Sequence, residues 1–383
     1  MDIAAIRAQL PLTRECIYLN TGGIAPGLEA VTQTLVSEYQ EIARRGPPLI
    51  MDYQRHSERL EETRGKLARF CGVEAADLCL THGVADGTTT VFNGFDWQPG
   101  DELILTDEEH PAVQMPAERL TTSHGVQLRF LPIGGGEAQI LQRLEDLITP
   151  RTRLLALSHV TTDTGTRLPA RAIVELAHQR GVPVLYDGAQ SLGQFPVNLS
   201  QLGADFYSLL AYKWMFGPYT AGALYVEKSW QEKLRVVPSS ANYFGSSGAR
   251  RFEFAAVPPP YYYASAAATD YIQGLGIPRI EAQVKALAAV LRRHLETIPG
   301  LVIENPQDPA MCTGIVTFRV EGVEGPHIST ALRTRKIITR PTGLKFSGVR
   351  VSVSFFTTQE ELDTLVGTVG EIAAASRSPQ PPS

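Results

Sequence analysis

The sequence predicts an α/β protein in which a large domain, with a mainly parallel sheet flanked by helices, is followed by a smaller C-terminal α+β domain. Three observations predict this organisation. At 383 residues the chain exceeds a single ordinary core. From about residue 78 onward, short apolar runs alternate with amphipathic segments, as in a parallel sheet with crossover helices. Around Val237–Pro260 the composition changes to Ser, Gly, Arg and three consecutive prolines, which indicates a passage between two domains.

The large domain is assigned to residues 21–245, and its strands are expected at seven apolar runs. In chain order these runs are Leu78–Leu80, Leu103–Leu105, Val126–Leu131, Leu154–Leu157, Val182–Tyr186, Phe206–Leu210 and Ala223–Val226. Among the connecting segments, Ala170–Arg180 repeats apolar positions at helical spacing and stops at Gly181, a residue typical of a helix C-terminus. Parallel sheets of this kind bind ligands at the carboxyl ends of their strands.

The smaller domain is assigned to residues 255–375. A long helical region interrupted near Gly274–Pro278, two strands and a final helix are expected there. They lie at Ala264–Leu295, at Gly314–Val320 and Arg350–Ser354, and from Gln359 to about Ala375. The Pro/Ser-rich tail, residues 376–383, is expected to be disordered.

The composition excludes several classes of function. With 35 basic and 40 acidic residues the formal charge is −5, so there is no electrostatic reason to expect nucleic acid or an anionic membrane as a partner. No apolar run approaches the roughly 20 residues that span a bilayer. Met1–Ala4 shows no basic segment followed by an apolar one, so a cytoplasmic location is expected by default. The four cysteines have no C-x-x-C spacing, and neither zinc nor disulfides are expected.

Asp187 and Lys213 each follow a buried apolar run, and together they suggest a cofactor site. Pyridoxal 5′-phosphate (PLP) needs such a pair, because a lysine amine bonds to its aldehyde and a carboxylate keeps its ring nitrogen protonated. Lys213 would hold the aldehyde and Asp187 the nitrogen. The alternative is a structural Asp at a strand end and an unrelated surface Lys. Either residue taken alone is more often structural, so the choice depends on the accompanying motifs.

Four further motifs accompany the pair in the order of one family. They are Asp187-Gly188-Ala189-Gln190-Ser191, Glu109-His110-Pro111, Gly217-Pro218 and Val349-Arg350-Val351-Ser352. From about Tyr18 to about Leu365 the chain resembles the class V aminotransferases of PLP fold type I, which include cysteine desulfurases, isopenicillin N epimerases, kynureninases and C–S lyases. It is most similar to the cysteine/cystine C–S lyases, in Gly100–Pro111 and in Arg251-Phe252-Glu253.

The resemblance implies roles for residues around the cofactor. His110 matches the histidine that stacks on the pyridine ring, and Gln190 matches the residue that hydrogen-bonds the phenolic oxygen. The loop Thr81–Gly87 opens a helix, and the backbone amides of Val84 and Ala85 are the expected phosphate donors. Both structural and functional interpretations remain open for such a loop, since many strand–helix turns look alike.

Several positions depart from the family pattern. Relatives usually have Ser or Thr three residues before the lysine and His directly before it, where this chain has Leu210 and Tyr212. Ala256 replaces a threonine that reaches the neighbouring subunit's phosphate. Tyr212 is therefore a candidate phenolic donor, with Tyr219 as a second candidate. Asp163 stands where relatives commonly carry Asn near the phenolic oxygen and the substrate carboxylate, and an extra anion there would change either substrate preference or the pKa of the Schiff base.

The resemblance also implies a substrate site and a dimer. Arg350 matches the arginine that clamps the α-carboxylate of an amino-acid substrate, a role that suits the paired donors of a guanidinium. Arg340 resembles a second arginine of C–S lyases that meets the distal end of the substrate, and Asn20 and Gly22 match a loop bordering it. Residues 1–20 are expected to pack on the small domain. A homodimer is expected, with Gly217–Thr220 and Arg251–Ala256 crossing over.

The reaction predicted is C–S β-elimination. A cysteine desulfurase carries sulfur on a mobile cysteine, and the segment between Lys336 and Gly348 has none. Lys213 would remove the α-proton as a general base. Cystine or a cysteine S-conjugate would yield pyruvate, ammonia and a thiol or persulfide. The alternatives are an epimerase, a decarboxylating or oxidative variant, a keto-acid-dependent aminotransferase, and a scaffold without catalysis.

Overall fold

The computed structural model describes residues 1–236, 246–254 and 258–377. Half of the predicted passage between domains, Val237–Pro260, lies outside these ranges, and so does Ala256. The predicted disordered tail lies outside the described residues beyond Arg377.

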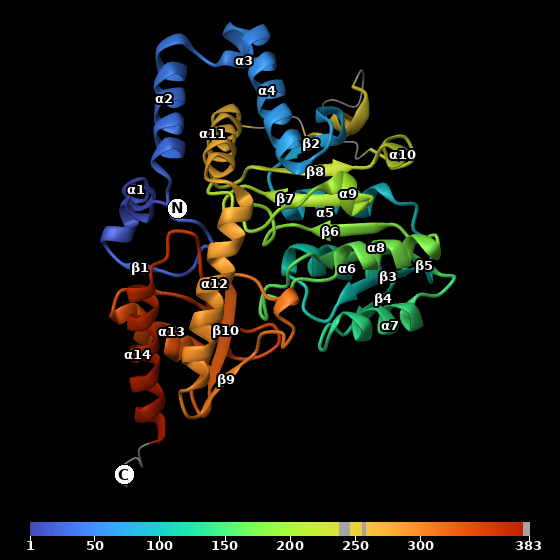
Figure 1. Ribbon diagram of the computed structural model, residues 1–383. Coiled ribbons are helices and arrows are strands. Elements are labelled where there is room, and N and C mark those ends of the chain that lie inside the picture. Colours follow the sequence, from blue (N-terminus) through green and yellow to red (C-terminus); the bar gives the residue numbers. More distant parts are fainter. Residues whose placement is uncertain (237–245, 255–257, 378–383) are drawn as a thin grey trace.

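The large domain is built on a seven-stranded sheet with the strand order β2-β8-β7-β6-β5-β3-β4 (Figure 1). Its strands are β2 (Leu78–Thr81), β3 (Glu102–Thr106), β4 (Gln127–Leu131), β5 (Thr152–Ser158), β6 (Val184–Asp187), β7 (Phe206–Leu210) and β8 (Gly222–Val226). The five strands from β4 to β7 are mutually parallel, and β8 runs antiparallel to both of its neighbours. Each strand overlaps one of the predicted apolar runs, which confirms the mainly parallel sheet.

Helices cover both faces of this sheet and bury its side chains in two separate cores. These helices are α5 (Val84–Gly94), α6 (Pro111–His124), α7 (Glu137–Leu147), α8 (Ala170–Gln179), α9 (Leu199–Leu202) and α10 (Lys228–Gln231). Alternate residues of one strand enter opposite cores: Leu155 and Leu157 belong to one, Leu154 and Ala156 to the other. The predicted helix at Ala170–Arg180 is α8, and Gly181 has the positive φ of 71° expected after a helix.

The smaller domain has a four-stranded antiparallel sheet in the order β12-β13-β10-β9. Its elements are β9 (Leu301–Ile303), β10 (Ile315–Val320), α13 (Gly325–Thr334), β11 (Ile337–Ile338), β12 (Arg340–Thr342), β13 (Gly348–Ser352) and α14 (Gln359–Arg377). Two long helices, α11 (Pro259–Leu275) and α12 (Ile277–Glu296), connect it with the large domain (Figure 1). They break at Gly276, which has a φ of 86°, inside the predicted interruption.

The N-terminal segment reaches both domains. Helix α1 (Ile3–Ala8), a 3-10 turn at Pro11–Arg14 and β1 (Ile17–Tyr18) come first, and β1 pairs in parallel with β11 of the small domain. Helices α2 (Glu29–Arg45), α3 (Pro48–Met51) and α4 (Tyr53–Cys71) then form an arm at the top of Figure 1. Further 3-10 turns lie at Ala75–Asp77, Gly248–Phe252 and Pro309–Met311.

The topology brings several polar strand ends together. Parallel strands β3, β5, β6 and β7 end at one edge of the large sheet, so Thr106, Ser158, Asp187 and Leu210 lie along that edge. Strand β13 approaches the same edge from the small domain and carries Arg350 at its centre. Among the described helices, none is both long and apolar enough to cross a membrane.

Candidate active site

A cavity of about 540 Å³ opens at this edge of the large sheet. Its walls come from the strand ends, the start of α5, the N-terminal loop and β12. The lining residues are Gly23, Ile24, His82, Gly83, Val84, Ala85, Asp86, His110, Ala112, Asp187, Ala189, Leu210, Tyr212, Lys213, Tyr219 and Arg340. Six of the residues predicted from the sequence to bind the cofactor, together with the predicted substrate residue Arg340, therefore surround one space.

Lys213 follows β7 and is buried, with 6% of its surface exposed. Burial, together with the nearby guanidinium groups of Arg350 and Arg340, lowers the pKa of its amine to about 7, while Asp187 opposes the shift. A large fraction of this amine is therefore neutral at pH 7. Only the neutral amine can attack an aldehyde or accept a proton.

Asp187 ends β6 and is also buried. Its Oδ1 accepts a hydrogen bond from Ala189 N at 2.7 Å, and its carbonyl accepts one from His159 N at 2.9 Å. Burial raises the pKa of the carboxyl group, whereas the Ala189 amide and Lys213 oppose this. A carboxylate fixed in this way and desolvated is suited to bind a protonated ring nitrogen.

His110 caps the N-terminus of α6, where its Nδ1 accepts a hydrogen bond from Ala112 N at 3.1 Å. Burial lowers the pKa of this histidine to about 4, and Lys213 and the two arginines contribute. The ring is therefore neutral at pH 7. Because Nδ1 accepts from the backbone, the hydrogen of the neutral ring lies on Nε2, and the ring is held at the wall of the cavity.

Glu109 precedes His110 and binds the ends of two neighbouring strands. Its carboxylate accepts hydrogen bonds from Ser158 N at 2.8 Å, Ser158 Oγ at 2.6 Å and Thr106 Oγ1 at 2.7 Å. It thereby joins the ends of β3 and β5 directly beneath His110. In the sequence, Glu109 stands out only as part of the motif Glu109-His110-Pro111. Its role could have been inferred from a polar strand end on each of two adjacent parallel strands.

The start of α5 forms another wall of the cavity. Gly83 has a φ of 142°, a conformation that favours glycine, and it lets the backbone turn from β2 into the helix. As the first residues of α5, Val84 and Ala85 present amides without partners inside the helix. His82 and Asp86 also line this wall and are joined by a hydrogen bond of 3.1 Å. This pair was not predicted, because nothing in the loop's sequence separates it from an ordinary turn.

Tyr212 and Tyr219 stack at the mouth of the cavity, with ring centroids 4.4 Å apart and planes 27° from parallel. Burial raises the pKa of Tyr212, so its phenol remains a hydrogen-bond donor at neutral pH. Both predicted phenolic candidates thus line the space, beside the turn that begins α5. Leu210, the other departure from the family pattern, contributes an apolar wall.

A second, smaller cavity of about 180 Å³ adjoins the first through His110 and Arg340. Its lining residues are His110, Pro111, Thr162, Asp163, Arg340, Pro341, Thr342, Gly343, Leu344 and Arg350. It lies between the large domain and the β12–β13 hairpin of the small domain, and it places two arginines next to the Lys213 cavity.

Arg350 is fully buried in this second cavity, and only one of its nitrogens is used. Its Nη1 donates to Thr162 O at 2.9 Å and to Thr162 Oγ1 at 3.0 Å. Its Nε and Nη2 are buried and have no hydrogen-bond partner in the described part of the chain. Burial and the neighbouring Arg340 lower the pKa of the guanidinium to about 9. A buried cation with two unused parallel donors is a site for a carboxylate.

Three residues that were predicted to bind cofactor or substrate line neither cavity, namely Gln190, Asn20 and Gly22. Gln190 accepts from Trp214 Nε1 at 2.7 Å and donates to Gly22 O at 2.9 Å, and it is not among the lining residues. Its contact with a phenolic oxygen stays a prediction. Asn20 and Gly22 pack against Ser352, while the next residues of this loop, Gly23 and Ile24, reach the cavity.

Comparisons with known proteins identify the family of this chain. A family profile described as "Aminotransferase class-V" matches residues 17–365. The chain belongs to the class-V aminotransferase family. It is 30% identical to a probable cysteine desulfurase of Mycolicibacterium paratuberculosis over 97% of this chain, although it spans only 58% of that protein. It is also 28% identical to the isopenicillin N epimerase of Streptomyces clavuligerus, covering 95% of this chain and 96% of that protein.

Solved structures agree with this assignment. The structure of the cystine C–S lyase C-DES in complex with cysteine persulfide has 27% sequence identity and a TM-score of 0.88, covering 95% of this chain and 99% of that one. A mutant of the same protein carries glycine covalently linked to PLP. PLP is the cofactor of class-V aminotransferases, and this chain is a PLP-dependent enzyme. The family and the cofactor predicted from the sequence are both confirmed.

The residues of this class-V aminotransferase fit PLP. A buried amine of lowered pKa, a buried carboxylate and a fixed histidine ring line one cavity, namely Lys213, Asp187 and His110. The free amides at the start of α5 lie on the same wall and suit a phosphate. We expect Lys213 to bond the aldehyde, Asp187 to bind the ring nitrogen and Val84 and Ala85 to hold the phosphate. These individual assignments remain predictions.

Asp163 lies in the second cavity rather than beside Lys213. It is 5% exposed, and its Oδ2 accepts hydrogen bonds from Leu344 N at 2.9 Å and Lys345 N at 3.1 Å. The sequence could not reveal these contacts, because the partners are 181 and 182 residues away. One oxygen of its carboxylate, Oδ2, therefore binds the small domain.

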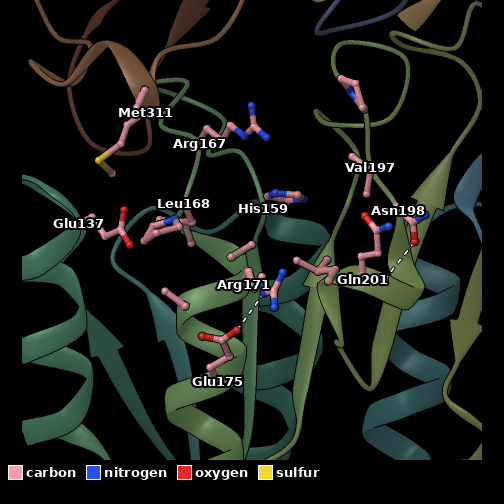
Figure 2. Close-up of a pocket in the computed structure, with 16 residues that line it drawn as sticks. Glu137, His159, Arg167, Leu168, Arg171, Glu175, Val197, Asn198, Gln201 and Met311 are labelled. Carbon is pink, nitrogen blue, oxygen red and sulfur yellow. Dashed lines mark hydrogen bonds and ion pairs between the residues drawn. The ribbon is translucent and has the colours of Figure 1, made fainter. Parts of the chain in front are cut away.

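A hollow of about 570 Å³ lies elsewhere on the class-V aminotransferase fold, beside α8 and α9 (Figure 2). None of the residues predicted to bind cofactor or substrate lines it. Figure 2 shows His159 at its base and Arg171 paired with Glu175 on α8, a pair separated by 2.8 Å. Burial lowers the pKa of His159 to about 3, and its Nδ1 lies 2.9 Å from Tyr207 Oη. His159 is therefore a neutral, hydrogen-bonded residue of the core.

The cysteines form no site in the described part of the chain. All four are free; Cys71, Cys79 and Cys312 are buried, whereas Cys16 is only half-buried. Across residues 1–236, 246–254 and 258–377, no group of three metal-ligating side chains of the His, Cys, Asp or Glu type is present.

Proposed function

We propose that this enzyme is a PLP-dependent C–S β-lyase that cleaves cystine or a cysteine S-conjugate to pyruvate, ammonia and a thiol or persulfide. The observation that carries the proposal is the pair of adjoining cavities. One holds the buried amine of Lys213, and the other holds two arginines placed to bind a substrate with a carboxylate at each end.

The α-carboxylate of the substrate is assigned to Arg350. Its unused Nε and Nη2 form one edge of a buried guanidinium, which matches the two oxygens of a carboxylate. Thr162 fixes the opposite side of the group through Nη1. Because the cavity that holds Arg350 adjoins the cavity that holds Lys213, a carboxylate bound by Arg350 would lie next to the proposed reacting centre.

The distal end of the substrate is assigned to Arg340. Its side chain is exposed, lines both cavities and makes no ion pair within the part of the chain that the structure describes. An unpaired cation at the mouth favours substrates that end in a second carboxylate, as cystine does. Hydrophobic S-conjugates would gain nothing from this contact.

Lys213 is the proposed proton carrier. Bound PLP would supply the electron sink for the pair left on Cα when its proton is removed. Lys213 Nζ takes that proton, the Cβ–S bond breaks, and the sulfur leaves with the bonding electrons. The resulting enamine is hydrolysed to pyruvate and ammonia. An amine with a pKa of about 7 is well matched to this transfer at neutral pH.

The desulfurase activity named for several relatives is not proposed here. A sulfur-carrying cysteine would be needed near the β12–β13 hairpin, and residues 336–348 contain none. Among the described residues, Cys71, Cys79 and Cys312 are buried, and burial raises the pKa of the Cys71 thiol to about 12. These thiols are therefore poor nucleophiles.

The proposal includes a homodimer in the cytoplasm. Tyr219, at the cavity mouth, is 54% exposed in the single chain, which supports a partner that covers this edge. Four free cysteines support a reducing compartment.

The test begins with the cofactor. Purified wild-type protein should be yellow, and Lys213→Ala should lose the absorbance band while keeping its far-ultraviolet circular dichroism. Wild-type protein is then incubated with cystine and with S-conjugates, and pyruvate is measured with a coupled dehydrogenase. Racemisation without pyruvate would replace the lyase with the epimerase activity named for one relative. A colourless protein that takes up no added PLP would refute the enzyme itself.

A further inference from the structure

Asp163 lies where the two domains meet, facing the tip of the β12–β13 hairpin. Its buried Oδ2 accepts hydrogen bonds from two successive backbone amides of that tip, those of Leu344 and Lys345. Hydrogen bonds to a charged acceptor are stronger than those between neutral groups. One carboxylate oxygen of the large domain thus holds the tip of a small-domain hairpin.

The backbone around Asp163 is itself fixed. Asp163 N donates to Glu108 Oε1 at 2.8 Å, and Thr317 Oγ1 of β10 donates to Asp163 O at 2.6 Å. One residue later, Thr164 O accepts from Asn305 Nδ2 at 2.7 Å. Since both domains hold this backbone, the carboxylate is a rigid anchor.

Within the described residues, one other side-chain contact joins the hairpin tip to the large domain. Lys345 Nζ lies 3.0 Å from Asp107 Oδ2, but these side chains are 36% and 31% exposed, so the pair contributes little. Arg340 begins β12, a strand of only three residues that continues into the tip. The direction of the Arg340 side chain therefore depends on how the hairpin tip is held against the large domain.

We propose that Asp163 is a positioning residue for Arg340: by docking the hairpin tip, it holds Arg340 at the boundary of the two cavities and so sets the preference for substrates with a distal carboxylate. The part that concerns substrate preference rests on the proposed lyase function. The docking itself does not. Asn, common at this position in the resembled family, offers the same amides a neutral oxygen and therefore a weaker contact.

The docking is tested by hydrogen exchange of the segment 340–347 in the cofactor-loaded protein. In Asp163→Ala we expect exchange of the Leu344 and Lys345 amides to accelerate about ten- to a hundredfold, the range for loss of a hydrogen bond to a charged group. Asp163→Asn should accelerate it by a smaller factor. The control, Lys345→Ala, removes the exposed ion pair but keeps both amides, and its exchange should stay near the wild-type rate.

Exchange at the wild-type rate in Asp163→Ala would overturn the proposal. If Asp163→Ala fails to fold, Asp163→Asn alone decides the question. Exchange of the two amides several-fold faster than in wild type supports the docking of the hairpin tip by Asp163. An unchanged exchange rate refutes it. This measurement needs no turnover, so an absence of lyase activity would refute the proposed function and leave the docking untouched.

The consequence for specificity is tested by kinetics with two substrates. Cystine has a distal carboxylate and S-phenylcysteine does not. We expect Asp163→Ala to lower the ratio of their kcat/KM values about tenfold, mainly through KM for cystine, and Arg340→Ala to do the same. The double variant should lose no more than Arg340→Ala alone. An equal loss on both substrates, or additive losses, would show that Asp163 does not act through Arg340.

Discussion

Three residues of the cavities have pKa values far from their usual ones, and each shift has a local cause. Burial and two guanidinium groups lower the pKa of Lys213 to about 7 and that of His110 to about 4. Burial and Arg340 lower the pKa of Arg350 to about 9. The site therefore combines a neutral amine and a neutral imidazole with a guanidinium that remains charged. Shifts of this size are concentrated at functional sites.

The lowered pKa of Lys213 predicts how cofactor capture depends on pH. The rate at which cofactor-free protein forms its yellow band should rise with a midpoint near pH 7, because the amine reacts only when neutral, rather than near the usual value of 10.5. Removing a nearby positive charge in Arg350→Gln should move the midpoint upward. Arg319→Gln, at an exposed residue that lines neither cavity, is the control for net charge, and equal midpoints in all three proteins would contradict the assignment.

At the scale of elements, the cavity depends on close contacts between strand ends. Glu109 joins β3 to β5 beneath His110, and burial raises the pKa of this carboxyl to about 7. Gly83 turns the chain from β2 into α5, and Gly222 of β8 packs directly against it. Neither contact involves the cofactor, yet both fix the residues that bind it.

Glu109 predicts a dependence of stability on pH. Its folded pKa of about 7 exceeds the ordinary 4.5, so the folded state binds more protons between these values, and stability should fall as pH rises through this window. In Glu109→Gln this contribution disappears, and the fall in unfolding free energy from pH 5 to 7.5 should shrink by on the order of 1–3 kcal/mol. Urea unfolding of cofactor-free protein measures it. An identical pH slope in the variant would show that Glu109 is not the titrating group.

Gly222 provides a test of the strand–helix turn. A Cβ at this position would lie 2.8 Å from Gly83 Cα and would collide with the Leu209 carbonyl. We expect Gly222→Ala to cost about 1–3 kcal/mol of unfolding free energy and to weaken PLP binding, because Gly83 must move. Gly274→Ala, at an open position in α11, should be harmless. Wild-type PLP affinity in Gly222→Ala would show that the turn can shift without cost to the site.

At the scale of the whole molecule, two domains and an N-terminal loop each contribute one wall of the site. Lys213 comes from the large domain, Arg350 from the small domain, and Gly23 from the loop between β1 and α2. The arm formed by α2, α3 and α4 lies at the top of Figure 1, where α2 and α4 pack against α11, and it exposes large apolar side chains. These include Val36, Tyr39, Leu49, Ile50, Met51 and Tyr53, between 46% and 77% exposed.

We expect the exposed apolar side chains of the arm to belong to the proposed dimer interface, in addition to the cavity edge at Tyr219. Exposed apolar patches of this extent mark interaction surfaces. We expect wild-type protein to sediment as a dimer, and Ile50→Asp, at a position 77% exposed in the single chain, to shift it toward monomer at micromolar concentration. Glu137→Lys, on the exposed start of α7, serves as a surface control. A dimer unaffected by Ile50→Asp would place the interface elsewhere.

The features that could be predicted from the sequence are those that depend on local patterns of residues. Buried strands such as Val184–Asp187 are apolar runs, and their charged ends lie along one edge of the sheet, so Asp187 and Lys213 could be grouped from sequence. The anchor between Asp163 and Leu344 could not, because it depends on how two domains meet. The arm was missed because its helices are largely polar and present no continuous apolar run. Gln190 was grouped with the cofactor by motif, yet its amide contacts Gly22 and Trp214.

The central claim is that substrate bound at Arg350 and deprotonated by Lys213 loses its β-sulfur. The most direct test is nuclear magnetic resonance of the loaded enzyme with cystine in deuterated water. We expect pyruvate and persulfide sulfur in equal amounts, with loss of both in Lys213→Ala. Recovery of cystine carrying deuterium at Cα, with inverted configuration and no pyruvate, would contradict it and identify an epimerase.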